Sequence, residues 1–356
     1  MNKVWKVVVG ILVVILVIIS SYVLYLYLSY HREPDDLTLE VNNHSTDALQ
    51  LNHDYKLMTF NIGYGAYPSD YSFFMDGGKY SRAYDQETVE KNMKAIETAV
   101  ASENPELAIF QEVDVDGDRS QHVNEVEYLE TQFNNYSSVY AQNYDSAYLF
   151  YPFTQPIGKA SSGLVTLSKG EVESSTRYSL PIETDFNKFI DLDRAFSVTH
   201  IKVDDDRQLA LINTHLSAFT KDRSIQEAQM DKLFTQMEKE YKQGHYVIVG
   251  GDYNHDVIGN SPEVFETKKE RETWTHPFPV NSIPDNFQLA QGDLAERKIP
   301  SVRAMDQAYD EETSYVSLVD GFLVSDNITL KTVRVKDLGF ENSDHNPVVL
   351  TFELNE

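Results

Sequence analysis

The sequence of 356 residues contains no cysteine. This absence excludes disulfide bonds, thiolate metal sites and cysteine nucleophiles. Any exported part of the chain must therefore be stabilised by its hydrophobic core, and a bacterial surface protein is the natural interpretation. Hydrophobic residues make up 41% of the chain and aromatic residues 12%, which is ample for a sizeable core.

Basic residues are also scarce. The chain has 30 Lys and Arg residues against 56 Asp and Glu residues, and its formal net charge at pH 7 is −26. An acidic surface repels polyanions, so the charge argues against tight nonspecific binding of long nucleic acid. A local basic strip is still compatible with this total.

Charge of either sign is absent from residues 7–28. As a helix this run would be about 33 Å long, enough to cross the apolar core of a bilayer. Lys3 and Lys6 precede the run and three acidic residues soon follow it, so the positive-inside rule places the N-terminus in the cytoplasm. We therefore expect residues 1–30 to form a single-pass anchor in the cell membrane, with the rest of the chain extracellular. A cleaved signal peptide is the alternative, but the run is longer than usual and no clear A-x-A site follows.

The remaining chain divides into two parts. Residues 31–51 are polar, contain Pro34 and show no persistent apolar period, which predicts a linker. Residues 52–356 are expected to form one folded domain. Apolar spacing and alternation predict helices at 86–102, 126–133 and 224–244, and strands at 55–61, 106–114, 195–203, 208–215, 246–250, 314–325 and 348–354.

Polar residues follow several of these strands. VIVGGDYNHD (residues 247–256) has an apolar run that is interrupted by two glycines and followed by Asp252 and Asn254. A polar strand end of this kind is often a ligand site, but an Asp- and Asn-rich turn has the same composition. Asn61 ends another strand and is ordinarily a turn residue, and a lone histidine such as His215 is more often structural.

Glu112 ends a buried strand, where a carboxylate is costly unless a cation pairs with it. This makes Glu112 a candidate metal ligand, although it could instead emerge into solvent. The following VDVDGD (residues 113–118) has acids at alternate positions, as a calcium loop does. The rest of the calcium-loop pattern is incomplete, so we interpret this segment as an acidic, solvated turn.

Six short segments recur in one order along the chain. They are TFNI (59–62), QEV (111–113), THL (214–216), GGDYN (250–254), VDGFLVS (319–325) and SDHNPV (343–348). With these segments, residues 55–354 resemble the endonuclease/exonuclease/phosphatase superfamily, which includes DNase I and the neutral sphingomyelinases. Each segment alone is weak, but six in order make chance agreement improbable.

The resemblance implies a fold and a cofactor for residues 52–356. The expected fold is a DNase I-like four-layer α/β sandwich, in which two mostly antiparallel sheets are flanked by helices. The expected cofactor is Mg²⁺, with Mn²⁺ as a possible substitute. Glu112 would be the principal metal ligand with Asn61 beside it, and Asp344 would complete the metal side. Such all-oxygen ligation is what Mg²⁺ prefers.

The resemblance also implies catalytic roles. Asp252, oriented by Asn254, would position or deprotonate the attacking water. His345, held by Asp320, would support the phosphate and the developing charge. The general base is then either Asp252 or the His345–Asp320 pair. Two further residues would contact the substrate, namely His215 as a hydrogen-bond donor to the phosphate and Arg194 as a basic residue near it.

The implied reaction is hydrolysis of a phosphodiester by a membrane-anchored extracellular enzyme. The superfamily acts on nucleic acids and on phospholipid or sphingomyelin head groups, and these motifs do not distinguish them. The alternative is a catalytically silent surface-binding module on the same fold. Apart from substrate and membrane, no feature of the sequence indicates an obligate protein partner.

Overall fold

The computed structural model describes residues 3–42, 45–204, 207–218, 223–269 and 271–356. The helices are α1 Lys3–Ser29, α2 Gln86–Glu103, α3 Glu125–Gln132, α4 Arg223–Lys242, α5 Ser261–Val264 and α6 Leu294–Arg297. The strands of the first half are β1 Leu37–Thr38, β2 Val41–Asn42, β3 Asp54–Asn61, β4 Leu107–Gly117, β5 Ser137–Asp145, β6 Ala160–Ser168, β7 Val172–Ser179, β8 Ala195–Lys202 and β9 Gln208–His215. Those of the second half are β10 Tyr246–Asp252, β11 His255–Asp256, β12 His276–Pro277, β13 Phe287–Leu289, β14 Val302–Arg303, β15 Val316–Ser317, β16 Asp320–Ser325, β17 Ile328–Val335 and β18 Val348–Leu354.

Two seven-stranded sheets form the centre of the domain. Sheet A has the order β1-β7-β8-β9-β10-β16-β13, and sheet B has the order β17-β18-β3-β4-β6-β5-β2. Within these two sheets, the described strands pair in parallel only at β9–β10 and β3–β4, and the other neighbours are antiparallel. Each parallel pair is connected by a long helix, α4 or α2, as a parallel crossover requires.

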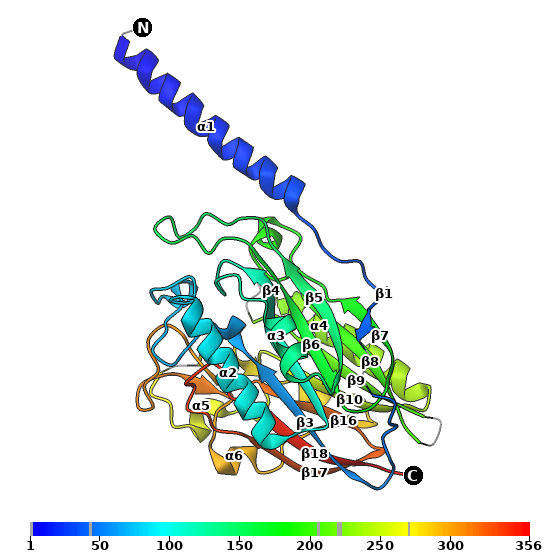
Figure 1. Cartoon of the computed structure of the whole chain (residues 1–356). Helices are drawn as coiled ribbons and strands as arrows, with labels where there is room; N and C mark the ends of the chain where they lie inside the picture. The colour runs from blue at the N-terminus through cyan, green and yellow to red at the C-terminus, as the bar shows by residue number, and fades with distance from the viewer. Residues whose placement is uncertain (1–2, 43–44, 205–206, 219–222, 270) are drawn as a thin grey trace.

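Helices α2, α3 and α4 cover the outer faces of the two sheets (Figure 1). Helix α2 begins at the N-cap Asp85, whose side chain accepts a hydrogen bond from Thr88 N, and ends at Asn104 in the left-handed conformation. Its buried side chains pack with those of α3 on sheet B. A larger apolar core joins the facing sides of the two sheets to α4. The predicted α/β sandwich of two mostly antiparallel sheets flanked by helices is therefore confirmed.

The glycines of β10 have a different role from the one that the sequence suggested. The strand continues through Gly250 and Gly251 to Asp252 without interruption. Gly251 has φ +145°, and a Cβ atom there would lie 1.9 Å from the carbonyl oxygen of Thr214 on β9. Glycine is required at this position because two backbones approach closely, not because the chain turns.

The N-terminal helix α1 projects from the domain (Figure 1). It is the only helix among the described residues that is long and apolar enough to cross a membrane, with a mean hydropathy of 3.1. The segment 31–51, expected to be a linker, instead contributes an edge strand to each sheet, because β1 pairs with β7 and β2 pairs with β5. An interpretation based on polar composition missed these two short strands.

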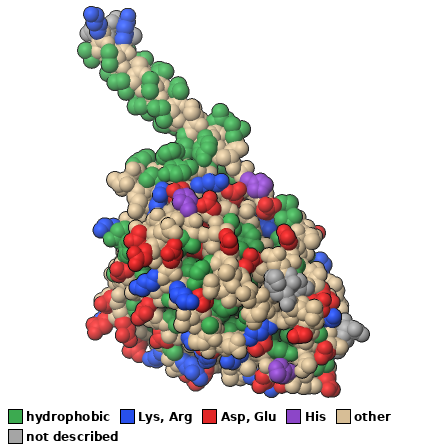
Figure 2. Space-filling view, viewed as in Figure 1, with side chains coloured by type: hydrophobic (Ala, Val, Ile, Leu, Met, Phe, Trp, Pro, Cys, Tyr) green, Lys and Arg blue, Asp and Glu red, His purple; other side chains and the backbone are tan. Residues whose placement is uncertain are grey.

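The C-terminal end of α1 contacts the domain through aromatic side chains. The Tyr22 hydroxyl donates to the carbonyl oxygen of Tyr148 at 3.2 Å, and the Tyr30 hydroxyl donates to Asp193 Oδ1 at 3.0 Å. Leu26 is buried in a small apolar cluster that includes Leu149. Figure 2 shows hydrophobic side chains gathered where the helix meets the domain.

Candidate active site

The two parallel strand pairs direct their carboxyl ends to one edge of the sandwich. Asn61 is the last residue of β3, His215 the last of β9 and Asp252 the last of β10. Glu112 lies on β4 immediately after Gln111, which pairs with Asn61. The edge at which parallel strands end is where α/β folds usually bind ligands. Four of the predicted site residues are brought together in this way.

Two antiparallel neighbours begin at the same edge. Strand β16 starts at Asp320, which lies opposite Asp252 in the ladder. Strand β18 runs antiparallel to β3, and Asp344 and His345 lie just before its first residue. Both sheets therefore contribute acidic and imidazole side chains to one site, although these residues are up to 284 positions apart in the sequence, counting from Asn61 to His345.

Glu112 occupies a bulge in β4. The β4–β6 register shifts between Phe110 and Val113, and Glu112 adopts a left-handed φ of 57°. Bulges of this kind redirect a side chain, and the carboxylate of Glu112 lines the cleft. Burial and the nearby charge of Asp344 raise the pKa of Glu112 to about 8, although His345 opposes the shift. The sequence had placed Glu112 at a strand end, whereas β4 continues past it to Gly117.

Asp252 is held by two hydrogen bonds. Its Oδ1 accepts the backbone N–H of Asn254 at 2.8 Å, and its Oδ2 accepts from Asn61 Nδ2 at 3.0 Å. Burial and the charge of Asp320 raise the pKa of Asp252 to about 7, and the charge of His345 partly offsets them. Asn254 therefore orients Asp252 through its backbone, while its side chain donates to the carbonyl oxygen of Leu216 at 2.8 Å.

His345 and Asp320 form a buried pair. His345 Nδ1 lies 2.8 Å from Asp320 Oδ2, which also accepts from Ser301 Oγ at 2.7 Å. Burial alone would lower the pKa of His345, but Asp320, Asp344 and Asp252 together raise it to about 10. This shift favours the imidazolium form of His345, whose Nε2 lies 3.7 Å from Asp252 Oδ2.

His215 is the neutral counterpart of His345. Burial, followed by the charges of Arg194 and His345, holds the pKa of His215 well below its usual range. Its Nε2 lies 3.5 Å from Asp252 Oδ2 and 3.8 Å from Glu112 Oε1.

The site opens into a cleft of about 380 Å³. Arg194, as expected from the sequence, lines it and donates to the carbonyl oxygen of Leu216 at 3.0 Å. Arg119 and Arg303 also line it, and the sequence interpretation missed both. These three arginines lie among seven acidic residues of the same lining, so the cleft as a whole is not a basic strip.

The acidic segment at 113–118 differs from its sequence interpretation. Asp114 is fully buried on β4, and both of its carboxylate oxygens accept from Arg119, at 2.9 and 3.2 Å. The guanidinium of Arg119 lies 3.2 Å from the ring centroid of Tyr64. The segment is a strand end that positions a cation beside the cleft, and it is not a solvated turn. The sequence did hold one signal of this arrangement, because Arg119 follows Asp114 closely enough to pair with a buried carboxylate.

The donor set at Glu112 fits a hard divalent cation. Glu112, Asp344 and Asn61 offer oxygen atoms, which Mg²⁺ prefers. Burial is the main cause of the raised pKa of Glu112, and the charge of Asp344 adds to it. Asn61 Oδ1 accepts from Gly63 N at 3.1 Å and retains a second lone pair.

A second group of candidate ligands lies close by. The ligating atoms of Asp252, Asp320 and His345 fall within 4.8 Å of one another. Asp320 Oδ2 already accepts hydrogen bonds from His345 and Ser301, so this group is also a hydrogen-bonded acid–imidazole array.

Comparison with known proteins identifies the relatives of this chain. A family model described as the endonuclease/exonuclease/phosphatase family matches residues 58–345. A search of curated protein sequences found no match.

Solved structures share the fold at low sequence identity. An endonuclease/exonuclease/phosphatase from Beutenbergia cavernae aligns with a TM-score of 0.56 at 13% identity, over 85% of this chain and 72% of that chain. D. rerio TDP2 in complex with a single-strand DNA product aligns with a TM-score of 0.52 at 13% identity, over 85% and 100%. The human Nocturnin catalytic domain with a bound sulfate aligns with a TM-score of 0.52 at 16% identity, over 89% and 98%. At these identities the likeness shows the fold alone.

Proposed function

Because the chain belongs to the endonuclease/exonuclease/phosphatase family, we propose that its cleft hydrolyses phosphodiester bonds with the help of Mg²⁺, for which Mn²⁺ can substitute. The observation that carries this proposal is the meeting of Glu112, Asp252 and His345 at one sheet edge beside three arginines. A phosphodiester is anionic, and this arrangement offers charge compensation, a base and an acid around one point.

The metal would be held by Glu112, Asn61 and Asp344. When bound, it would neutralise charge on the phosphate and polarise the phosphorus. The remaining steps belong to side chains. His345, kept protonated by Asp320, donates a hydrogen bond to a phosphate oxygen, and His215 donates a second one. The arginines orient the substrate from the cleft wall.

We assign the general base to Asp252. Its pKa, raised to about 7, suits proton transfer from water near neutral pH, whereas the raised pKa of His345 favours the protonated form, which donates and does not accept. The hydrogen bonds from Asn61 and from the backbone of Asn254 fix the orientation of the carboxylate. The sequence had left the choice of base open.

We further propose that α1 anchors the enzyme in the cell membrane, with the N-terminus cytoplasmic and the domain extracellular. Lys3 and Lys6 lie before the apolar stretch of the helix. The alternative of a cleaved signal peptide is disfavoured because the hydroxyls of Tyr22 and Tyr30 bind the folded domain.

The position of the anchor favours a membrane phosphodiester as the substrate. An apolar rim, defined here as Met75, Phe150, Tyr151, Phe153 and Ile190, is exposed, with Phe153 at 85%. The rim connects the anchor to the cleft. Phe150 packs against Tyr22 of α1 at 5.4 Å between ring centroids, and Met75 and Ile190 line the cleft. Exposed aromatic side chains beside a membrane helix favour insertion into the lipid interface, so the cleft would open towards lipid head groups.

Single-stranded nucleic acid is the second candidate substrate. It is favoured by the three arginines that line the cleft. The net charge of −26 argues against a long duplex.

A substrate panel tests the function. Full-length protein in detergent is assayed on a soluble phosphodiester, bis(4-nitrophenyl) phosphate, and on single-stranded DNA. The same protein in vesicles is assayed on phospholipid and sphingomyelin. Each assay is run with Mg²⁺ and with EDTA. We expect turnover that requires the metal, with the vesicle lipid as the best substrate. Turnover of DNA but not lipid favours the nuclease, and no turnover of any phosphoester favours the silent binding module.

Rim variants separate membrane contact from chemistry. Tyr151→Ser combined with Phe153→Ser is expected to lower hydrolysis of vesicle lipid about tenfold, the equivalent of 1.4 kcal/mol, and to leave hydrolysis of the soluble diester unchanged. Val280→Ser, which changes an exposed apolar residue in the loop after β12, is the control. Equal loss on both substrates would show that the rim supports the fold and does not contact the membrane.

A further inference from the structure

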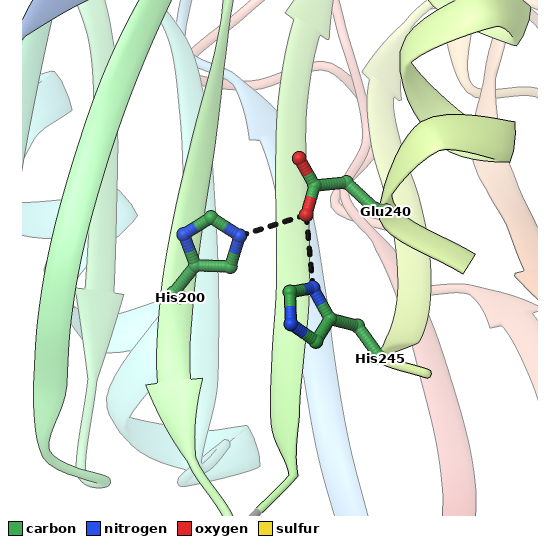
Figure 3. A group of neighbouring side chains, drawn as sticks. All are labelled: His200, Glu240 and His245. Carbon is green, nitrogen blue, oxygen red and sulfur yellow. Dashed lines mark hydrogen bonds and ion pairs between the residues drawn. The ribbon is translucent and has the colours of Figure 1, made fainter. Parts of the chain in front are cut away.

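A third group of candidate metal-ligating side chains lies far from the cleft. His200 on β8, Glu240 on α4 and His245 just before β10 point towards one another (Figure 3). Glu240 Oε2 lies 2.8 Å from His200 Nε2 and 2.9 Å from His245 Nδ1. All three ligating atoms fall within 4.8 Å of one another.

The strand register explains how the two histidines meet. His200 lies opposite Ala210 of β9, and Ala210 lies opposite Val247 of β10, two residues after His245. The histidine-bearing segments are thus separated by one strand, or roughly 10 Å across two strand spacings. Because Ala210 is small, the two rings lean towards each other above β9, with centroids 5.2 Å apart. The last turns of α4 place Glu240 over this gap.

Neighbouring polar groups hold the cluster in a ligating arrangement. His200 Nδ1 lies 3.1 Å from Ser174 Oγ, and Glu240 Oε1 accepts from Gln236 Nε2 at 2.6 Å. When Nδ1–H donates to the serine hydroxyl, the lone pair of His200 Nε2 faces Glu240. Metal-binding histidines are usually fixed by a hydrogen bond of this kind on the other ring nitrogen.

We propose that His200, Glu240 and His245 bind a divalent transition-metal ion of the zinc class. Two imidazole nitrogens and one carboxylate suit Zn²⁺ and its neighbours, whereas Mg²⁺ prefers oxygen ligands. Tetrahedral Zn²⁺ holds ligand atoms about 3.4 Å apart, so the cluster needs to open by roughly 0.5 Å. The histidine side chains are 17% and 15% exposed and that of Glu240 is 4% exposed, which leaves solvent access for a water as the fourth ligand.

The proposed site would act on stability and not on the reaction. It links β8, α4 and β10 at the end of sheet A opposite to the cleft. At about 3.3 Å per residue, β10 places Asp252 roughly 20 Å from the start of the strand. A bound metal ion would therefore tie the helix to the sheet without touching the substrate.

Zinc binding to the full-length protein in detergent tests this proposal. The protein is stripped with EDTA and then kept in excess Mg²⁺, so that the oxygen ligands of the cleft are occupied. After addition of Zn²⁺ and desalting, bound zinc is counted by mass spectrometry and thermal unfolding is recorded. We expect about one equivalent of zinc and a higher Tm, because an ion that binds only the folded state stabilises it.

The zinc equivalent and the rise in Tm should disappear in His245→Gln and in Glu240→Gln. They should persist in His122→Gln, a matched control in which the changed histidine also pairs with an acid, Asp116, at 2.7 Å. Hydrolysis of the soluble diester should be unaffected by His245→Gln. Equal zinc binding and equal Tm shifts in all four proteins would overturn the proposal.

Chemical labelling of the unmodified chain supplies a test that needs no variant. Diethyl pyrocarbonate modifies accessible histidines, and the modified peptides are identified by mass spectrometry. Zn²⁺ should protect His200 and His245 and leave His122 reactive. Modification of His200 and His245 at unchanged rates in saturating Zn²⁺ would contradict the proposed ligands.

Discussion

Gly251→Ala offers a sharp test of how the sheet positions the site. The new Cβ atom would lie 1.9 Å from the carbonyl oxygen of Thr214, and side-chain carbons essentially never approach a backbone atom within 3.0 Å. Since the obstacle is the backbone of the paired strand, relief requires β9 and β10 to separate by about 1 Å. The φ of +145° adds a strain of about 1–3 kcal/mol for a residue other than glycine. We expect the free energy of unfolding to fall by about 4 kcal/mol or more, at the top of the range for single substitutions.

Urea denaturation of the full-length protein, followed by tryptophan fluorescence, measures this loss. Gly259→Ala is the matched control because Gly259 also has a positive φ, +80°, but nothing lies within 4 Å of its Cβ position. The control should lose only about 1 kcal/mol. The reasoning fails if the Gly251 variant loses no more stability than the control. Any folded Gly251 variant should also lose activity, because His215 and Asp252 end the two separated strands.

Two further predictions concern charged pairs. Asp320→Asn should lower kcat by about 100-fold or more at pH 7. Because Asp320 helps to raise the pKa of His345 to about 10, the loss of activity on the alkaline side should begin at a lower pH in the variant than in the parent. A pH–rate profile measures both effects. Burial would raise the pKa of Glu240, but hydrogen bonds from its two histidine partners lower it to about 2. The Glu240 carboxylate therefore stabilises the fold above about pH 4.5, and this stabilisation is lost as the pH falls towards 2. In EDTA, Glu240→Gln should therefore be less stable than the parent at pH 6 by roughly 2 kcal/mol. The difference in Tm between the two proteins should shrink between pH 4.5 and pH 2. A difference in Tm that stays constant over this range would contradict this account.

The helices and strands that were predicted well from the sequence are specified by local apolar patterns. Helices α2 and α4 and the strands around Tyr55, Val247 and Val348 carry long apolar periods, and a period reports which face is buried. The polar residues at strand ends were identified because motif order carried information that single residues lack. The structure brings Asn61, Glu112 and the later motif residues to one sheet edge.

The features that were missed depend on contacts between distant segments. Arg303 is almost fully buried, in a region of short elements where no apolar period marks its position, and its guanidinium binds carbonyl oxygens more than 200 residues earlier. Asp114 was interpreted as solvated because its composition resembles that of a turn, whereas the bidentate pair with Arg119 allows it to be buried. The cluster at Glu240 joins two strands and a helix, and its register is set by pairing that no local pattern encodes.

The glycines at 250 and 251 also show that a local sequence pattern cannot reveal contacts with a distant strand. Composition alone favours a turn at two glycines followed by an acid, but the steric demand at Gly251 comes from Thr214, a residue on another strand. The segment at 31–51 is similar, since its two short strands are recognisable only when the edges of both sheets are in place.

The central claim is that Asp252 and His345 carry out metal-dependent phosphodiester hydrolysis. The most direct test of this claim is the initial rate of hydrolysis of bis(4-nitrophenyl) phosphate at saturating Mg²⁺. The full-length parent should show turnover that EDTA abolishes. Asp252→Asn and His345→Ala, with unchanged Tm, should each lower that rate by at least ~100-fold. Undiminished rates in both variants would contradict the account.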